Sequence, residues 1–289
     1  MRFGVIDVGT NAARLLVGEF KNETSSKIYY TRIPLRLGDD VYSTGFVSDH
    51  KITDFLRTIQ AFELICKSFQ VSKIKAVATS AMRDAKNATE IIKLIQEKTG
   101  VDLEVISGAT EANFILEAFT TLEFDKTLPF LVIDVGGGST EISVFENGQR
   151  TAAKSFELGT IRLLKQKESN YIWDDLSKWI EANIPSNKQL KTFGTGGNIG
   201  KAHKILDLKS SAPATISALQ VLHEKLRFLT MEERMIQFPL KSDRADVIVP
   251  ALEIYLFIMK RINCTEIFVP KIGLADGIIH SLETNLSNL

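Results

Sequence analysis

The pentapeptide Val-Ile-Asp-Val-Gly occurs twice in the chain, at residues 5–9 and at residues 132–136. Each copy ends an apolar stretch and leads into a turn of small residues, and a second apolar stretch follows at 13–20 or 141–145. Apolar stretches on both sides of a glycine turn are typical of a β-hairpin. Short strands that end in Asp-x-Gly are common, so coincidence is the alternative. The identical residues in matched surroundings favour a duplicated domain.

A duplicated domain fits the length of the chain, because 289 residues are too many for one ordinary hydrophobic core and enough for two domains. We expect the first domain at residues 1–124 and the second at residues 125–272, with a cleft between them. The last predicted helix, within residues 273–289, is expected to pack back on the first domain.

The segments outside the hairpins alternate between helical and extended patterns, which predicts an α/β fold of mixed sheets flanked by helices. Residues 51–69 carry apolar side chains at helical spacing. Asn87, followed three residues later by Glu90, predicts a capping box at the start of the next helix. Further helices are expected at 111–122, 172–182, 199–206, 216–229, 245–262 and 274–286, and strands at 74–78, 103–106 and 266–269.

The composition argues against several classes of partner. The 35 basic and 35 acidic residues balance, which argues against capture of nucleic acid or a membrane surface by bulk charge. No segment approaches the roughly 20 apolar residues of a membrane helix, and the first residues do not resemble a signal peptide. Cys66 and Cys264 are expected to be buried, reduced thiols of a cytoplasmic protein, although either could be a reactive thiol.

The second copy of the repeat is the best candidate for a phosphate site. Three glycines follow its strand, and their N–H groups can approach a phosphate closely because glycine has no Cβ. Two acidic residues flank the turn and can hold Mg²⁺ directly or through water. Glycines that only permit a tight hairpin are the alternative, but three in a row between two acids exceed that need. The residues are Asp134, Gly136, Gly137, Gly138, Ser139, Thr140 and Glu141.

The first copy of the repeat predicts a complementary phosphate loop. It has the same strand and turn, and an arginine follows at the start of the second apolar stretch. A cation beside such a turn would help to neutralise a bound phosphate. The residues of this loop are Asp7, Gly9, Thr10, Asn11 and Arg14.

Three further turns follow predicted strands and precede predicted helices, where helix N-termini favour anions. The hydroxyl of Ser80 and the guanidinium of Arg83 suit an anion, although Arg83 could equally be a surface ion-pair partner. Glu111 lies in a first helical turn, where a carboxylate commonly only stabilises the helix dipole. The third turn, an anion or nucleotide cradle, contains Gly194, Thr195, Gly196, Gly197 and Asn198.

The sequence lacks the motifs of several enzyme classes. The four histidines are scattered and none has an Asp or Cys at metal-ligand spacing, which argues against a zinc enzyme. The chain has no Gly-x-Ser-x-Gly elbow of a serine hydrolase and no P-loop.

Taken in order, the motifs resemble the exopolyphosphatase and guanosine pentaphosphate phosphohydrolase (Ppx/GppA) family in its short form. The aspartate-glycine loops alone indicate only the wider actin, Hsp70 and sugar-kinase superfamily, whose fold implies two actin-like (ribonuclease H-like) domains. The segments that carry the resemblance are 7–11, 78–85, 106–108, 111–112, 134–141, 158–159, 162–163, 194–197, 244–248, 273–274 and Gly277.

The resemblance implies roles for these residues. Glu111 aligns with the family's catalytic glutamate, which acts as a base or orients the attacking water. Asp134 and Glu141 align with the acids linked to catalysis and to Mg²⁺ or Mn²⁺, and Asp7 is a further candidate ligand. Arg83 aligns with a phosphate-binding arginine. The implied reaction is the release of terminal orthophosphate from inorganic polyphosphate, or the conversion of guanosine pentaphosphate to tetraphosphate.

Three positions depart from the family pattern. Ala12 replaces a serine, Thr110 replaces an acid before the catalytic glutamate, and Ala275 replaces an arginine in the late glycine motif. These changes remove a hydroxyl, an acid and a cation. Resemblance to the short members implies that the helical extension with which long members bind polymer is lacking, so the hold on long polyphosphate is expected to be weaker or to depend on a homodimer.

Two other functions remain open at this point. The three departures would suit a sensor that binds polyphosphate or guanosine tetra- or pentaphosphate and hydrolyses little. An actin-like ATPase or sugar kinase would need an adenosine pocket at residues 194–197, and the presence of Glu111 makes it less favoured.

Overall fold

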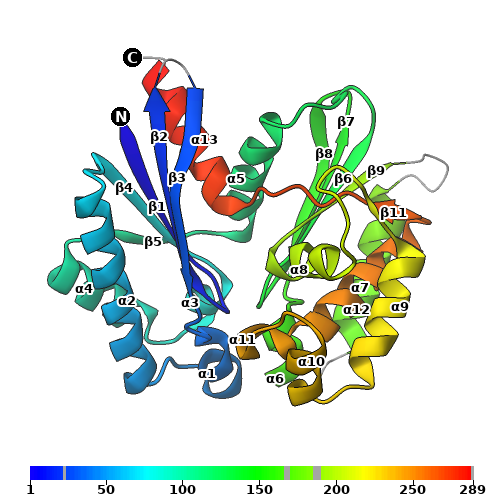
Figure 1. The fold of residues 1–289 in the computed structure, drawn as a ribbon, viewed down its shortest axis with the longest axis horizontal. Helices are drawn as coiled ribbons and strands as arrows, with labels where there is room; N and C mark the ends of the chain where they lie inside the picture. Colours follow the sequence, from blue (N-terminus) through cyan, green and yellow to red (C-terminus); the bar gives the residue numbers. More distant parts are fainter. Residues whose placement is uncertain (22–23, 166–169, 185–189, 288–289) are drawn as a thin grey trace. The chain divides into compact units, whose positions relative to one another are not determined.

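The structure is a computed structural model, which describes residues 1–21, 24–165, 170–184 and 190–287 (Figure 1). The chain forms two compact units. Unit 1 comprises Met1–Leu122 and Ile272–Leu289, and unit 2 comprises Glu123–Lys271.

Unit 1 is built on a five-stranded mixed sheet in the order β3-β2-β1-β4-β5. Strand β2 is antiparallel to β1 and β3, whereas β4 is parallel to β1 and β5. Helices α5 and α13 lie on one face of this sheet, and α2 and α4 lie on the other (Figure 1). The elements are β1 (Arg2–Val8), β2 (Ala13–Lys21), β3 (Thr24–Ile33), α1 (Leu37–Thr44), α2 (Asp49–Ser68), β4 (Lys73–Ala78), α3 (Ser80–Asp84), α4 (Ala88–Thr99), β5 (Leu103–Val105), α5 (Gly108–Thr120) and α13 (Leu274–Ser287).

Unit 2 is built on a four-stranded mixed sheet in the order β8-β7-β6-β9 and also has a small two-stranded sheet, β10-β11. Its core contains helix α12, most of whose residues are buried. The elements are β6 (Phe130–Val135), β7 (Thr140–Glu146), β8 (Gln149–Phe156), α6 (Thr160–Lys165), α7 (Asn170–Asn183), β9 (Lys191–Thr195), α8 (Gly197–Ile205), β10 (Ala214–Thr215), α9 (Ile216–Arg227), α10 (Met231–Gln237), α11 (Ser242–Ala245), α12 (Ile248–Arg261) and β11 (Glu266–Ile267).

The duplication predicted from the pentapeptide extends to the backbone. Both hairpins start with the same antiparallel pair, and in both a parallel strand joins the other edge of the first strand. The turns close in the same way, since Gly9 N–H donates to Ala12 O (3.0 Å) and Gly136 N–H donates to Ser139 O (2.9 Å). Even the register shift recurs, between Val17 and Gly18 in unit 1 and between Val144 and Phe145 in unit 2.

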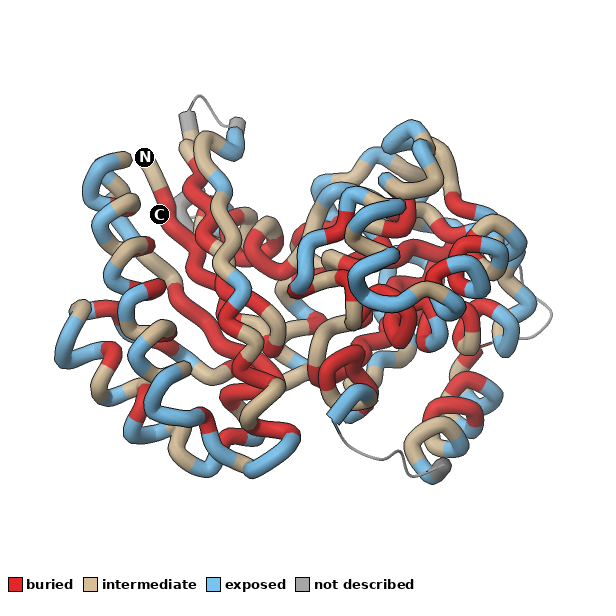
Figure 2. Tube along the Cα trace, turned by 60° about the horizontal axis from the view of Figure 1, so that its bottom comes forward, coloured by how far each residue is buried: buried red, intermediate tan, exposed pale blue. Residues whose placement is uncertain are grey.

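Apolar strands explain why these sheets form the centres of the units. Strands β1 and β6 are buried along most of their lengths, and Figure 2 shows the buried residues concentrated along the central strands of each unit. In unit 1, α13 covers the sheet by packing Leu274, Ile278 and Ile279 against Val5 and Leu16. The predicted fold class, an α/β fold with two mixed sheets flanked by helices, is confirmed.

Two local predictions were wrong for physical reasons. Asn87 does not form a capping box, because its side chain instead accepts from Val47 N–H (3.0 Å) and donates to Val47 O (2.8 Å). The helix expected at 245–262 is α12, but it begins at Ile248 instead of Ala245, which ends the separate helix α11. Pro250 explains the break, because a helix continuing through Asp246 would need the N–H that proline lacks and would clash with the Asp246 carbonyl. In the first turn of α12, proline is tolerated.

The expected strand at 266–269 is shorter than predicted. Only Glu266–Ile267 form β11, and Phe268 makes an isolated bridge to Phe193. Within the described residues, no helix combines the length and hydropathy needed to cross a membrane.

The two cysteines carry free thiols, but only Cys66 is buried as expected, and Cys264 is half-buried. Cys66 packs so closely against β1 that a Cβ on Gly4 would lie 2.9 Å from its Sγ. Burial, with a smaller contribution from Glu63, raises the pKa of Cys66 to about 11. Burial also raises the pKa of Cys264.

Cys66 is therefore expected to be unreactive in the native protein. A thiol reacts as its thiolate, and a pKa raised to about 11 keeps Cys66 protonated at pH 8 and below. A Cys264→Ser variant, in which Cys66 is the remaining thiol, should react with a chromogenic disulfide reagent at pH 8 only after denaturant is added. Rapid labelling of this variant under native conditions would contradict the assignment.

Candidate active-site elements

The β1–β2 loop of unit 1, which was predicted to bind phosphate, is held by contacts on both sides. Asp7, 4% exposed, accepts from Arg14 Nη1 at 2.6 Å across the β1–β2 pair. The carbonyls of Thr10 and Asn11 accept backbone N–H groups of Gly38 (3.1 Å) and Arg36 (2.9 Å) at the start of α1. Arg14, which was expected to neutralise phosphate, therefore contacts the carboxylate of its own loop.

Tyr42 joins this loop to the turn that follows β4. Its hydroxyl lies 2.7 Å from Ser80 Oγ and 3.4 Å from Thr10 Oγ1, and all three side chains are buried. Two predicted phosphate-binding residues, Thr10 and Ser80, are thus brought together through a residue that the sequence did not single out. A tyrosine in an amphipathic helix has no sequence feature that distinguishes this role from core packing.

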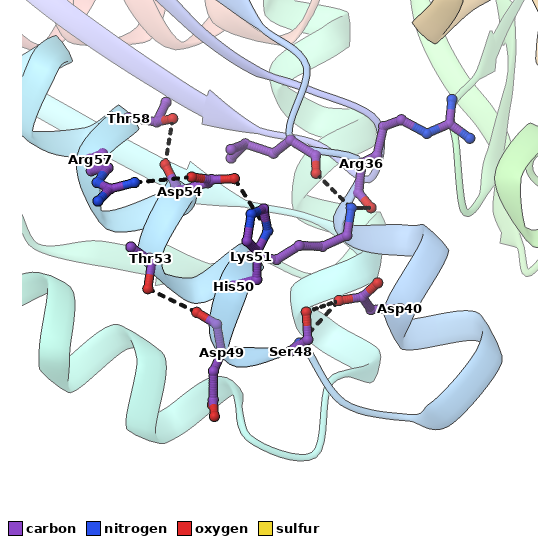
Figure 3. A network of polar contacts seen from close by, with 11 residues as sticks. Arg36, Asp40, Ser48, Asp49, His50, Lys51, Thr53, Asp54, Arg57 and Thr58 are labelled. Carbon is purple, nitrogen blue, oxygen red and sulfur yellow. Dashed lines mark hydrogen bonds and ion pairs between the residues drawn. The ribbon is translucent and has the colours of Figure 1, made fainter.

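A polar network holds α1 in place beside the loop (Figure 3). Lys51 Nζ donates to the carbonyls of Leu35 (3.0 Å) and Arg36 (2.8 Å), immediately before α1. Within α1, the Asp40 carboxylate accepts from the backbone N–H and the hydroxyl of Ser48, which immediately precedes α2. Arg36 takes a left-handed conformation, with φ 52°, which turns the chain from the loop region into the helix.

Tyr42→Phe is expected to lower kcat/KM for phosphate release about tenfold, because the phenyl ring fills the same space but no longer bridges Thr10 and Ser80. The free energy of unfolding should fall by only about 1 kcal/mol, the usual net value of a hydrogen bond. Tyr30→Phe, which removes the hydroxyl of an exposed tyrosine on β3, is the matched control. Equal activity of Tyr42→Phe and the control in initial-rate assays would exclude a positioning role for the hydroxyl.

Arg83 and Glu111 meet in unit 1, although 28 residues separate them. Arg83 Nη1 donates to Ile106 O (2.8 Å) and to Glu111 Oε2 (3.1 Å). Glu111 lies in the first turn of α5, whose N-terminus is capped by Ser107 Oγ accepting from Thr110 N–H (3.1 Å). The Glu111 carboxylate, 12% exposed, is therefore oriented by a cation as well as by the helix.

In unit 2, Asp134 and Glu141 are paired in register on β6 and β7, at the positions that Asp7 and Arg14 occupy in unit 1. Opposed residues of an antiparallel pair have Cβ atoms about 5 Å apart, where like charges destabilise each other. Glu141 is 3% exposed and its Oε1 accepts from Ser155 Oγ at 2.6 Å. This pair of carboxylates is a favourable place for a cation.

The glycine turn between these carboxylates is anchored through its carbonyl groups. Gly137 O accepts from Ile161 N–H (2.8 Å) and Arg162 N–H (3.1 Å), and Gly138 O accepts from Arg162 Nε (2.8 Å). A Cβ on Gly159 would overlap the backbone of Gly138, so only glycine permits this packing. With the carbonyls facing α6, the amides of Gly137 and Gly138 have no hydrogen-bond acceptor among the residues that the structure describes. Such amides can cradle an anion.

The turn after β9 lies against Asp134. Gly196 has φ 101°, and a Cβ there would lie 2.8 Å from Asp134 Oδ1. Beneath it, the buried Tyr255 hydroxyl donates to Thr195 O and accepts from Val135 N–H (3.3 Å). Burial and then the charge of Asp134 raise the pKa of Tyr255 well above its ordinary value. Tyr255 therefore remains a neutral donor, and it was not identifiable from sequence because it lies in an otherwise apolar helix.

Three buried side chains around these turns have a polar atom without a hydrogen-bond partner in the described part of the chain. They are Thr160 Oγ1, Thr195 Oγ1 and Asn198 Oδ1. Buried polar groups are nearly always paired, and an unpaired one commonly indicates an absent ion, water or ligand. Asn198 belongs to the glycine group after β9 that was predicted to cradle an anion. Thr160 was not predicted, although it follows a glycine in a turn, a pattern that could have singled it out.

The carboxylates of Asp134 and Glu141 fit a magnesium ion whose other ligands are water and substrate phosphates. The structure places no three His, Cys, Asp or Glu side chains together as a metal cluster within the residues it describes. Mg²⁺ is commonly held by one or two carboxylates, with waters and substrate phosphates as the remaining ligands. Asp134 and Glu141 supply such a pair, whereas Asp7, the further predicted ligand, is ion-paired with Arg14.

The sequence matches the model of the Ppx/GppA phosphatase family over residues 17–286. Exopolyphosphatase 1 of Mycobacterium tuberculosis is 26% identical over 304 residues, which cover 96% of this chain and 87% of that protein. A putative exopolyphosphatase of Haemophilus influenzae is 22% identical over 97% of this chain and 91% of its own length.

Solved structures show the same fold. An exopolyphosphatase from Cytophaga hutchinsonii superposes with a TM-score of 0.86 at 22% identity, covering 99% of this chain and 98% of that one. The Ppx/GppA member from Aquifex aeolicus superposes with a TM-score of 0.78 at 23% identity, covering 100% and 99%.

Proposed function

Because the chain belongs to the Ppx/GppA phosphatase family, we propose that it is a Mg²⁺-dependent exopolyphosphatase that releases terminal orthophosphate from inorganic polyphosphate by attack of water. Membership makes the chain a phosphatase, and the exopolyphosphatases among its relatives support this substrate. Guanosine pentaphosphate is a second proposed substrate, because its terminal phosphate is also held by an anhydride bond. The proposed location is the cytoplasm, where free thiols such as those of Cys66 and Cys264 persist.

The observation that carries the proposal is the glycine turn of unit 2, with amides that lack acceptors between two opposed carboxylates. Amides at Gly137 and Gly138 would bind the oxygens of a phosphate, and Thr160 Oγ1 would supply a further hydrogen bond. Asp134 and Glu141 would hold Mg²⁺, which when bound neutralises phosphate charge. Mn²⁺ prefers the same oxygen ligands and is the alternative ion.

Glu111, oriented by Arg83, is proposed to accept a proton from the attacking water. Arg83 carries a second proposed role, since its guanidinium also bears donors that suit a phosphate oxygen. The loop of Thr10 and Asn11 and the hydroxyl of Ser80, positioned by Tyr42, are proposed further phosphate contacts.

Orthophosphate release should be measured over a panel of substrates: tripolyphosphate, long-chain polyphosphate and guanosine pentaphosphate. Each should be tested with Mg²⁺, with Mn²⁺ and with a chelator. The proposal predicts release from polyphosphate with a divalent ion and none with the chelator. If neither tripolyphosphate nor long-chain polyphosphate yields orthophosphate with either ion, the chain is not an exopolyphosphatase.

The alternative is a sensor that binds polyphosphate or guanosine penta- or tetraphosphate with little hydrolysis. The three departures from the family pattern favour it, yet in this chain those residues have structural contacts. Ala12 is buried and its carbonyl closes the first turn, Thr110 Oγ1 lies 2.9 Å from the capping hydroxyl of Ser107, and Ala275 packs in the apolar cluster under α13. Calorimetry would separate the cases, because tight binding without product would favour the sensor.

A further inference from the structure

Ser155 belongs to a row of side chains that runs across the four-stranded sheet of unit 2. Strand register places Ser155 on β8 opposite Glu141 on β7, and Glu141 opposite Asp134 on β6. The row ends on β9, where Thr195 is the parallel partner of Asp134. Residues in register on neighbouring strands lie on the same face of a sheet. The row therefore gathers two carboxylates between two hydroxyl side chains.

The equivalent row of unit 1 carries a different set of charges. There Asp7 is opposite Arg14, and Arg14 is opposite Arg32 on β3. Arg14 Nη1 donates to Asp7 Oδ2 at 2.6 Å, so this row contains a fixed cation for its acid. In unit 2 an acid and a hydroxyl occupy the places of the two arginines. The duplicated hairpin thus holds its own cation in one copy and presents two acids beside a neutral donor in the other.

A short hydrogen bond joins Ser155 to the buried Glu141. Ser155 Oγ donates to Glu141 Oε1 at 2.6 Å. A hydrogen bond to an ionised acceptor is stronger than one between neutral groups, and a hydroxyl donor adds no charge of its own. The basic neighbour on β8, Lys154, points to the opposite face of the strand, where its Nζ donates to both carboxylate oxygens of Asp175 (2.9 and 2.8 Å).

Both carboxylates of the row lie close to the buried hydroxyl of Tyr255 on α12. Burial, then the charge of Asp134 and to a lesser extent that of Glu141, raise the pKa of Tyr255. The Tyr255 hydroxyl is itself held by the backbone, since it donates to Thr195 O and accepts from Val135 N–H. The two acids therefore share one partly enclosed place, in which the orientation of Glu141 depends on its contact with Ser155.

We propose that Ser155 is a positioning residue for the divalent cation of unit 2. Its neutral hydroxyl holds the Glu141 carboxylate in one orientation and leaves the negative charge of the Asp134–Glu141 pair for Mg²⁺ or Mn²⁺. Hydrogen bonds made to ligating carboxylates commonly contribute about 10- to 100-fold to metal affinity. This inference rests on the proposed function for the identity of the ion, and it assigns to Ser155 an effect on ion affinity.

The test measures the affinity for Mn²⁺ without substrate, from the electron paramagnetic resonance signal of the free ion. Ser155→Ala should bind Mn²⁺ about tenfold more weakly than the wild type, because the Glu141 carboxylate is no longer held. Ser155→Thr keeps the hydroxyl and suits a strand, so its affinity should lie within about threefold of the wild type. The control is Ser177→Ala, which removes a buried hydroxyl that donates to Trp173 O (2.8 Å) within α7 and should leave the affinity unchanged.

Thermal unfolding without metal checks that the variants are folded. A loss of Mn²⁺ affinity that threonine restores separates positioning of the carboxylate from general destabilisation. The proposal is overturned if the wild type takes up no Mn²⁺, if Ser155→Ala binds as tightly as the wild type, or if Ser155→Thr or Ser177→Ala loses as much affinity as Ser155→Ala.

These measurements need no turnover, so their outcome is separable from that of the proposed function. A protein whose Mn²⁺ affinity falls in Ser155→Ala, but which releases no orthophosphate, would refute the hydrolase and retain the role of Ser155. Orthophosphate release together with unchanged Mn²⁺ affinity in Ser155→Ala would support the hydrolase and refute the role of Ser155.

Discussion

Glu111→Gln is expected to lower the rate of orthophosphate release by about 100- to 10,000-fold, the usual contribution of a general base. Glutamine has the same shape and can still accept from Arg83 Nη1, so the contact at 3.1 Å survives while the proton acceptor is lost. KM should change little, because the substitution removes no group that binds phosphate. The free energy of unfolding should change by less than about 1 kcal/mol, since one partly exposed ion pair is lost.

The matched control is Glu117→Gln, which makes the same chemical change on the same helix, α5. Initial rates with Mg²⁺ and saturating polyphosphate should be normal for this control, and thermal unfolding should confirm that both variants are folded. If Glu111→Gln retains more than about one third of wild-type kcat, Glu111 contributes only helix stabilisation and another base must be sought.

Gly277→Ala is expected to have the largest effect on stability, about 3 kcal/mol or more. Helices α5 and α13 approach so closely that a Cβ on Gly277 would overlap the carbonyl oxygen of Phe114 and lie 3.1 Å from Ala118 N. Overpacking commonly costs about 1–3 kcal/mol when side chains can adjust. Here the obstacle is backbone, so the two helices must separate or α13 must leave the sheet. Because α5 also carries Glu111, phosphatase activity should fall as well.

Gly200→Ala tests whether this loss comes from the close approach rather than from the substitution itself. Gly200 lies inside helix α8, and a Cβ there has no neighbour within 4 Å. Alanine is the better helix former by about 1 kcal/mol, so this variant should be as stable as the wild type or slightly more stable. Chemical denaturation gives both values. A Gly277→Ala loss below about 1 kcal/mol would show that the helices are not held at this distance.

The sequence predicted the fold best where a pattern repeats. The twin pentapeptides located β1 and β6, and the apolar stretches after them located β2 and β7. The third strands, β3 and β8, were not predicted because they carry many polar, exposed residues and lie at the sheet edges. Edge strands of this kind lack the apolar period that identifies a buried strand.

The site could be predicted as separate turns but not as sets of contacts. Arg83 and Glu111 were each identified, yet only the tertiary structure shows that the Arg83 side chain reaches Ile106 O and Glu111. Tyr42 and Tyr255 act through hydroxyl groups that reach residues far away in sequence. Arg244 was noted as part of a motif, and its place over Gly197 depends on how α11 is positioned by the break before α12. Contacts between residues far apart in the sequence produce no local spacing pattern from which they could be predicted.

The most direct test of the account is phosphate release in water enriched in oxygen-18, with Mg²⁺ and polyphosphate of defined length. If the protein activates water against the terminal phosphate, mass spectrometry should find one oxygen-18 atom in each released orthophosphate, and the remaining chain should be shorter by one phosphate. Orthophosphate without the label, or no orthophosphate while the polymer remains intact, would contradict hydrolysis by water as the reaction of this protein.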